Sequence, residues 1–92
     1  MNRRVTLAKD PLSTLVGLHQ WKPVVAEAIE RVLDLIEAEP VDVSVRKRMF
    51  SRAAGNIWVV NIYAAGEDWT ILWDEITPGE PFIHLIAETT SV

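Results

Sequence analysis

A cluster of basic residues is the part of the sequence with the clearest capacity for chemistry. Four of the nine Lys and Arg residues lie within seven positions, and we call Arg46, Lys47, Arg48 and Arg52 the basic cluster. Such a cluster can contact RNA phosphates, and about three contacts would give weak, strongly salt-dependent binding. It can equally dock an acidic segment of a partner protein, or stay solvated along a strand and block edge-to-edge pairing. The residue types leave these three interpretations open.

The charge of the chain is divided unevenly between its two halves. Residues 1–52 hold all nine cations and seven of the 13 acidic residues, whereas residues 53–92 hold six acidic residues and no Lys or Arg. The first half therefore carries +2 and the second half −6. Because a negative surface repels phosphate, any contact with RNA must come from the first half of the chain.

Few other side chains are candidates for metal binding or catalysis. The chain has no cysteine, and its two histidines, His19 and His84, lie far apart in the sequence, so we expect no metal site and no cofactor. Asp74 is a candidate base, although a single carboxylate near a strand end is usually just solvated. A two-residue loop at Pro78–Gly79 would place His84 opposite Trp73, which predicts a hydrogen-bonded core histidine rather than a catalyst.

Two helices are expected in the first half of the chain. Asp10 and Pro11 are typical of an N-cap and a first helical position, and this helix must end by residue 22 because Pro23 follows. Its apolar side would comprise Leu12, Leu15, Val16 and Leu18. Pro23 opens a second helix, which ends at Glu39–Pro40 and has apolar residues at intervals of three and four. That stripe, expected to pack on a sheet, is Val25, Ala28, Ile29, Val32, Leu33 and Ile36.

The remaining segments have the alternation and the β-branched and aromatic residues of strands. Strands are expected at residues 4–7, 41–45, 57–63, 69–73 and 82–87, with turns at 64–67 and 78–79. Placing Ile62 opposite Trp69 also brings Trp58 opposite Trp73, which puts three tryptophans on one sheet face for the helices to cover. The opposite, open face would show the polar residues Asn61, Tyr63, Thr70 and Asp74 among Ile57, Val59 and Leu72, and is therefore unusually apolar for an exposed face.

The order of these elements defines an α+β domain: a short N-terminal strand, a two-helix pair, then an antiparallel meander of three or four strands packed on the helices. Ninety-two residues are expected to form one domain, 1–92. No apolar run approaches the ~20 residues that cross a bilayer. Two arginines near the start precede no signal-peptide core, because Lys9 and Asp10 interrupt the apolar residues beyond them. A cytoplasmic protein without a membrane partner is the expectation.

In its order of elements the chain resembles the RelE/ParE superfamily of bacterial type II toxin–antitoxin systems. The resemblance runs from about residue 3 to about residue 88, through "VLDLIEAEP", the basic cluster, "GNIWVVNIY", "DWTILWDEI" and "FIHLIAE". It implies a RelE/ParE-like fold, an antitoxin that binds and neutralises the chain, and an action on mRNA at the ribosome or on DNA gyrase. In RelE-like members the RNA's own 2′-hydroxyl is the nucleophile, and basic side chains on the open sheet face stabilise the charge on the reacting phosphate.

The sequence departs from the family pattern at the positions that carry this chemistry. Val59 and Asn61 stand where the family usually offers two alternating basic residues, and Thr70 stands where an arginine usually follows the leading aromatic. The segment beyond the last strand, residues 88–92, lacks the usual basic and tyrosine residues. Only the basic cluster, in the region before the central strand, keeps the family's character, so the usual catalytic set of an endoribonuclease is not present.

Three functions are therefore carried forward as expectations. The first is a toxin with a non-standard site, in which Arg46, Arg48 and Arg52 contact phosphate and Asn61, Tyr63 and Asp74 contribute from the open face. The second is a catalytically degenerate, non-enzymatic member that binds a protein partner or forms a homodimer through its apolar open face. The third is a small structural or adaptor protein without toxin ancestry.

Overall fold

The structure, a computed structural model, describes residues 5–39, 45–46, 48–53 and 55–89. Within these residues lie two helices and five strands, in the order β1 (Thr6–Leu7), α1 (Lys9–Trp21), α2 (Pro23–Ala38), β2 (Arg48–Arg52), β3 (Gly55–Ala64), β4 (Glu67–Thr77) and β5 (Glu80–Glu88). The predicted α+β class is confirmed.

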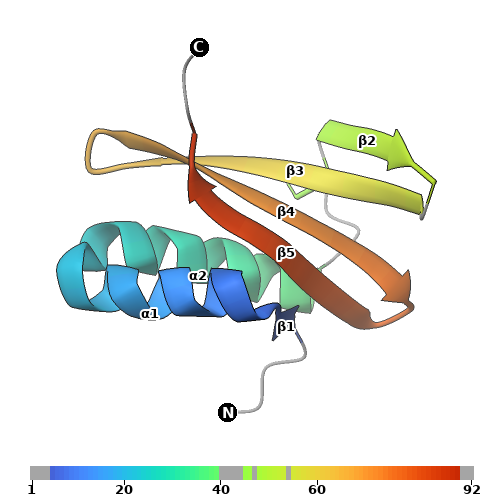
Figure 1. Cartoon of the computed structure of the whole chain (residues 1–92), viewed down its shortest axis with the longest axis horizontal. Helices are drawn as coiled ribbons and strands as arrows, with labels where there is room; N and C mark the ends of the chain where they lie inside the picture. Colours follow the sequence, from blue (N-terminus) through green and yellow to red (C-terminus); the bar gives the residue numbers. More distant parts are fainter. Residues whose placement is uncertain (1–4, 40–44, 47, 54, 90–92) are drawn as a thin grey trace.

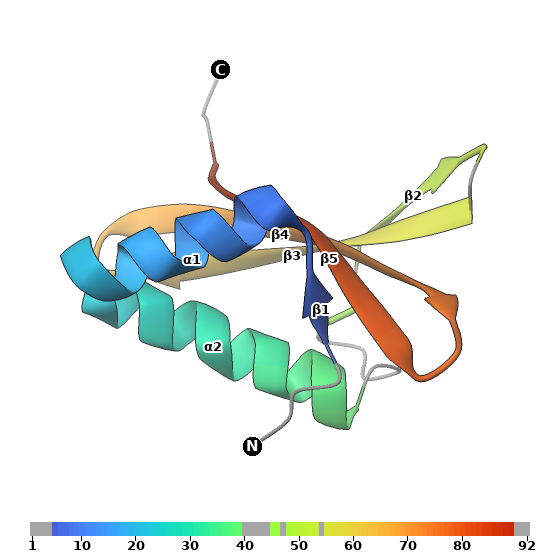
Figure 2. The ribbon, with the colours of Figure 1, turned by 60° about the horizontal axis from the view of Figure 1, so that its bottom comes forward.

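One mixed sheet contains all five strands, in the spatial order β1-β5-β4-β3-β2. The strands from β2 to β5 pair antiparallel, as expected for the meander, while β1 lies parallel to β5 at the opposite edge. Both helices lie on the same side of the sheet (Figures 1 and 2). The sheet therefore has a covered face, which contacts α1 and α2, and an open face, over which no described helix lies.

The covered face carries the tryptophans in the predicted register. Trp58 pairs with Trp73 and Ile62 pairs with Trp69. The ring centroids of Trp58 and Trp73 lie 5.1 Å apart, and Trp73 is fully buried. The buried residues that α2 contributes to this core are Val25, Ala26, Ile29, Leu33 and Ile36. Full burial of a Val, Leu or Ile side chain is worth about 1.5–3 kcal/mol, so this helix–sheet contact contributes substantially to the stability of the fold.

Helix α1 differs from its prediction at its start and on its outer side. It begins at Lys9 after Ala8, so Asp10 lies in the first turn and is not the N-cap. The reason is that the chain turns into the helix directly after β1, without the extra residues that an Asp10 cap would need. Of the four apolar residues expected on its buried side, Leu15 and Leu18 are buried, whereas Leu12 and Val16 are exposed.

The segment before β3 also differs from its prediction. Residues 41–44 of the expected strand lie outside the described residues, and Val45 lies in a turn rather than a strand. Val45 is buried, and its carbonyl accepts a hydrogen bond of 2.9 Å from Nε1 of Trp73. The strand β2 instead begins at Arg48 and runs through the second half of the basic cluster. Val45 thus packs into the core of the covered face, and the pairing of β2 with β3 starts at Arg48.

Two tight turns connect the later strands where the sequence predicts them. Ala65 and Gly66 join β3 to β4 with φ angles of 53° and 78°, the left-handed pair that a type I′ hairpin requires. Gly79, which follows Pro78, has a φ of 81°, as the third residue of a type II turn does. The first turn fixes the register of β3 and β4, and the second fixes the pairing of Thr77 with Glu80 where the β4–β5 pairing begins.

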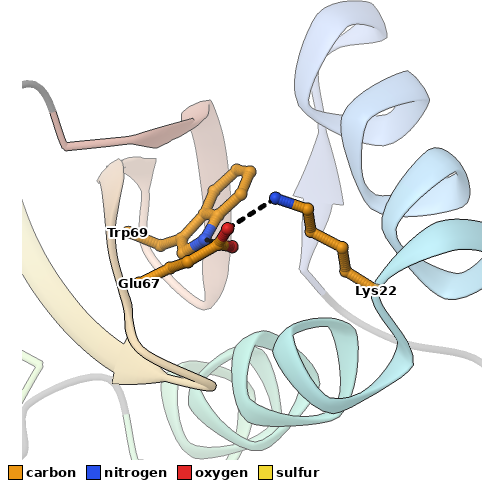
Figure 3. Close-up of polar contacts among 3 residues, drawn as sticks. All are labelled: Lys22, Glu67 and Trp69. Atoms are coloured by element: carbon orange, nitrogen blue, oxygen red, sulfur yellow. Dashed lines mark hydrogen bonds and ion pairs between the residues drawn. The ribbon is translucent and has the colours of Figure 1, made fainter.

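An ion pair joins the helices to the β3–β4 hairpin (Figure 3). Lys22, between α1 and α2, donates to Oε2 of Glu67 at 2.6 Å, and Nε1 of Trp69 donates to Oε1 of the same carboxylate at 3.2 Å. The hydrogen bond to Glu67 raises the pKa of Lys22, and the bonds from Lys22 and then Trp69 lower the pKa of Glu67. This contact holds the hairpin against the helical layer.

Candidate functional site: the open face of the sheet

Polar side chains form a hydrogen-bonded row across the open face. Arg48 Nη1 donates to Asn61 Oδ1, and Asn61 Nδ2 donates to Thr70 Oγ1 at 3.1 Å. The hydroxyl of Thr70 lies 2.6 Å from that of Thr89, beyond the end of β5. We call Arg48, Asn61, Thr70 and Thr89 the polar row. It joins the two groups of residues singled out in the sequence, because Asn61 pairs with Thr70 and Arg48, which pairs with Val59, reaches diagonally to Asn61 on the same face.

Beside the polar row, the centre of the open face is apolar. Leu72 pairs with Leu85 across β4 and β5, and Val59 pairs with both Leu72 and Arg48. Val59 and Ile57 are buried, yet they are not part of the core that the helices cover. Leu85 is 39% exposed. An apolar sheet face without a helical layer is typical of a binding surface rather than of a solvated one.

The far side of the open face holds a hollow of about 480 Å³. Its walls are Thr6, Asp74, Ile76, Thr77, Glu80, Phe82 and His84. Within it, His84 Nε2 lies 2.9 Å from Asp74 Oδ2, and the rings of Phe82 and His84 have centroids 4.8 Å apart. The side chain of Asp74 is only 2% exposed, so the prediction of a solvated carboxylate is wrong. We call this cavity the Asp74–His84 hollow.

The position of His84 on the open face corrects its predicted place among the tryptophans. Thr77 pairs with Glu80 and Leu72 with Leu85, which is the register that a two-residue loop predicts. Between these pairs the register shifts at two points, so that Trp73 faces Ile83 instead of His84. An extra residue in one strand turns the following side chains to the other face, and the second shift restores the register. Ile83 therefore enters the core, and His84 joins Asp74 on the open side.

Arg46 of the basic cluster belongs to the covered side of the molecule. Its guanidinium lies 4.0 Å from the ring centroid of Trp58 and 5.4 Å from that of Trp73. Its Nη2 is also 3.5 Å from Oε1 of Glu75, and both side chains are mostly buried. This arrangement is a cation–π contact reinforced by an ion pair. Arg46 is thus engaged in packing rather than offered to RNA or to a partner.

The other members of the cluster have different places. Arg48 is exposed at the start of β2 and is held toward the open face by its bond to Asn61. Arg52 pairs with Gly55 at the end of β2, and Lys47 lies outside the described residues. Tyr63 lies near the far end of β3, opposite Asp68, and is 72% exposed. The structure therefore brings Arg48, Asn61 and Thr70 together and places Asp74 apart from them, with His84.

Strand β2 forms an edge of the sheet and pairs with β3 on its other side. It lies beyond the helical layer, at the side of the molecule away from α1 (Figures 1 and 2). Met49 is 50% exposed and Phe50 is 55% exposed. Because neighbouring residues of a strand point to opposite faces, this edge displays apolar surface on both faces as well as the backbone groups of its outer side.

Some of these features can be predicted from the sequence. The role of Thr89 follows from the alternation of β5 once Thr70 is placed, and Phe50 is visible as an aromatic residue inside a charged segment. The hollow has no such signal, because it depends on the two register shifts and on β1, whose Thr6 pairs with Phe82.

Among the described residues, no group of three or more His, Cys, Asp or Glu side chains is arranged to hold a metal ion. The described helices include none that is long and apolar enough to cross a membrane. No protein-family model, curated protein or solved structure matches the chain, so the resemblance to the RelE/ParE superfamily stays a prediction.

Proposed function

We propose that this chain is a toxin-like protein-binding module of a bacterial type II toxin–antitoxin pair, and that its partner adds an extended segment to the free edge of β2. The observation that supports this proposal is an edge strand with exposed Met49 and Phe50 at its centre. Strand addition obtains affinity from backbone hydrogen bonds and specificity from alternate side chains, and β2 offers both.

The partner segment is expected to be partly apolar and acidic. Arg48 and Arg52 are the first and last residues of β2, and the other two residues of the basic cluster precede it directly in the sequence. The edge therefore lies in the most positive stretch of the sequence. Arginine is strongly favoured where a carboxylate is recognised by a planar, bidentate contact. A segment that alternates apolar and acidic residues would pair its acidic side chains with Arg48 on one face and cover Met49 on the other, whereas a basic segment would be repelled.

A nuclease of the usual RelE design is less well supported. Arg48 is on β2 and His84 is on β5, three strands away, which corresponds to about 14 Å at about 4.8 Å per strand. A cation and an acid–base group at that distance do not act on one phosphate, because catalytic contacts require hydrogen-bond reach. Arg46 is also unsuited to this role, since it is packed on Trp58 and Glu75.

The binding proposal can be tested with a synthetic peptide of alternating valine and glutamate, with a valine–lysine peptide of equal length as control. Backbone amide shifts in NMR spectra should change along β2 for the acidic peptide and not for the basic one. Phe50→Glu should remove the effect by placing like charge at the edge, whereas Val24→Glu, at a residue 59% exposed on α2, should not. Equal shifts with both peptides, or none with either, would overturn the proposal.

Direct toxicity is the second candidate function, favoured by the exposed Arg48 on the open face. Its test is induced expression in a bacterial host, with growth and incorporation of labelled methionine and thymidine followed together. An early fall in methionine incorporation would identify translation as the target, and an early fall in thymidine incorporation would identify DNA gyrase. Normal growth with folded protein would exclude the active toxin and leave the binding module.

A further inference from the structure

We propose that the Asp74–His84 hollow binds a small organic molecule that carries a planar cation, an amidinium or a guanidinium, on an aromatic body. In this site Asp74 orients His84, while His84, Phe82 and Glu80 contact the ligand. The inference goes beyond the proposed function, because the hollow is built by β1, β4 and β5 and lies away from the edge of β2. Three properties of the hollow carry it: its size, its charge and its fixed imidazole.

The hollow has the dimensions of a small-molecule site. Its volume of about 480 Å³ lies within the range of about 300–1,000 Å³ that is usual for ligand pockets. Phe82 stands at its centre, because this residue of β5 pairs with Thr6 of β1 on one side and with Asp74 of β4 on the other. The walls therefore belong to strands that are already paired, and the hollow is formed before a ligand enters.

Aromatic and apolar side chains form part of the wall. The rings of Phe82 and His84 have centroids 4.8 Å apart and are inclined by 56°. Ile76, which also lines the hollow, is 72% exposed. Covering an exposed apolar side chain is favourable, and an aromatic ring packs well against another ring. The body of the ligand is therefore expected to be flat and apolar.

The charge of the lining selects a cationic group. The described residues that line the hollow include two carboxylates and no Lys or Arg. Asp74 is 2% exposed and already lies beside His84, so the exposed Glu80 is the carboxylate that a ligand can reach. A planar amidinium or guanidinium can donate two parallel hydrogen bonds to one carboxylate and can also stack on an aromatic face. An anionic ligand would be repelled.

The imidazole of His84 is held in one orientation by Asp74. Nε2 of His84 is buried and lies 2.9 Å from Oδ2 of Asp74. Because a carboxylate accepts hydrogen bonds and does not donate them, the neutral imidazole carries its proton on Nε2. The side chain is nevertheless 31% exposed, so a part of the ring other than Nε2 faces the hollow. Nδ1 is then the acceptor for an N–H group of the cation, and Asp74 is a positioning residue.

NMR titration with benzamidine tests the proposal, with the neutral isostere benzamide as control. Benzamidine should bind at least about tenfold more tightly and shift backbone amides within residues 74–84, because only the cation pairs with Glu80. N-acetylarginine methylamide, which presents a guanidinium as a protein would, should bind more weakly because it lacks the ring. No saturable shift at millimolar benzamidine, equal affinities for benzamidine and benzamide, or tighter binding of the arginine derivative would overturn the proposal.

Two pairs of variants test the contacts, with circular dichroism to verify folding. Glu80→Gln should weaken benzamidine binding about threefold or more, whereas Glu88→Gln, an exposed position at the other end of β5, should not. Phe82→Leu should weaken it about threefold or more by removing the ring, whereas Phe50→Leu, at an exposed aromatic residue of β2, should not. Equal effects of a variant and its control would overturn the contact concerned.

The imidazole nitrogens report the role of His84 without a substitution. On addition of benzamidine, the NMR resonance of Nδ1 should move while that of Nε2, beside Asp74, stays nearly constant. His19, which is 3.6 Å from Glu30 and lies on α1, is the internal control and should not respond. An unchanged Nδ1 resonance at saturating benzamidine would overturn the acceptor role. None of these outcomes depends on peptide binding at the edge of β2.

Discussion

The two faces of the sheet use the same strands but are completed by different neighbours. On the covered face, the three sheet tryptophans meet an apolar helix stripe, and Trp73, Ile71 and Ile83 are fully buried. On the open face, Val59 and Ile57 are buried without belonging to that core, while Leu85 and Phe50 remain partly exposed. The comparison indicates that the covered face provides most of the buried core and that the open face leaves apolar surface exposed at Leu85 and Phe50.

The same division separates two cations of the basic cluster. Arg46 packs on the indole of Trp58 and pairs with Glu75 on the covered side. Arg48 bonds the neutral amide of Asn61 and stays exposed on the open side. Two arginines separated by a single residue therefore have different structural roles, because Arg46 lies in the turn that begins at Val45 and Arg48 begins a strand.

The largest effect is expected from the covered face. Trp73→Ala should lower the free energy of unfolding by about 3–5 kcal/mol, because it leaves a large cavity between the sheet and the helices and removes the bond to Val45. Chemical denaturation measures this change. Trp21, which is 78% exposed, provides the control, and its alanine variant should change stability by about 0.5 kcal/mol or less. Similar losses for the two tryptophans would contradict the comparison.

A smaller loss is expected from the buried carboxylate of the open face. Asp74→Ala should destabilise the fold by about 1–3 kcal/mol, since His84 would lose the carboxylate 2.9 Å from its Nε2. The same denaturation assay applies, with Asp68→Ala as the control because Asp68 is exposed. If the two variants were equally stable, Asp74 would contribute no more than a surface carboxylate does.

The two arginines should differ in the same direction. Arg46→Ala should cost about 1–2 kcal/mol, because it removes the cation–π contact, the ion pair and the packing of its aliphatic stem. Arg48→Ala should cost about 0.5 kcal/mol or less, since its guanidinium is solvated. Thermal unfolding of the two variants at equal concentration measures the difference. A greater loss for Arg48 would show that the open face, too, is needed for folding of the single chain.

The smallest effect is expected from the contact between Lys22 and Glu67, which is exposed to solvent. Since the pKa of Glu67 is lowered from its ordinary 4.5, its stabilising contribution is present above that value and is lost as pH falls through the folded-state pKa. The pKa of Lys22 is raised from 10.5, so its contribution is present below that value and is lost as pH rises through the folded-state pKa. Neutral pH therefore retains both contributions.

Lys22→Met tests this pH dependence. Unfolding temperatures of the wild type and the variant should converge as pH is lowered through the folded-state pKa of Glu67, and added salt should also reduce their difference. A difference that stays constant with pH would show that the lysine acts through its aliphatic stem rather than through its charge.

The sequence by itself determined the elements whose signals are local. The stripe from Val25 to Ile36 predicts α2, and Ala64–Glu67 and Pro78–Gly79 predict the turns, because helix periodicity and turn conformations depend on neighbouring residues. The register of β3 and β4 follows for the same reason, since a short hairpin loop fixes which residues face each other. The three tryptophans of the covered face were therefore predictable.

Only the tertiary structure decided the features that depend on distant segments. The guanidinium of Arg46 contacts Trp58, Trp73 and Glu75, and none of these residues is near it in the sequence. His84 lies on the open face because two register shifts between β4 and β5 displace it by one residue. Side chains alternate with a period of two along a strand, so a one-residue shift changes the face, and no local pattern in the sequence marks where it occurs.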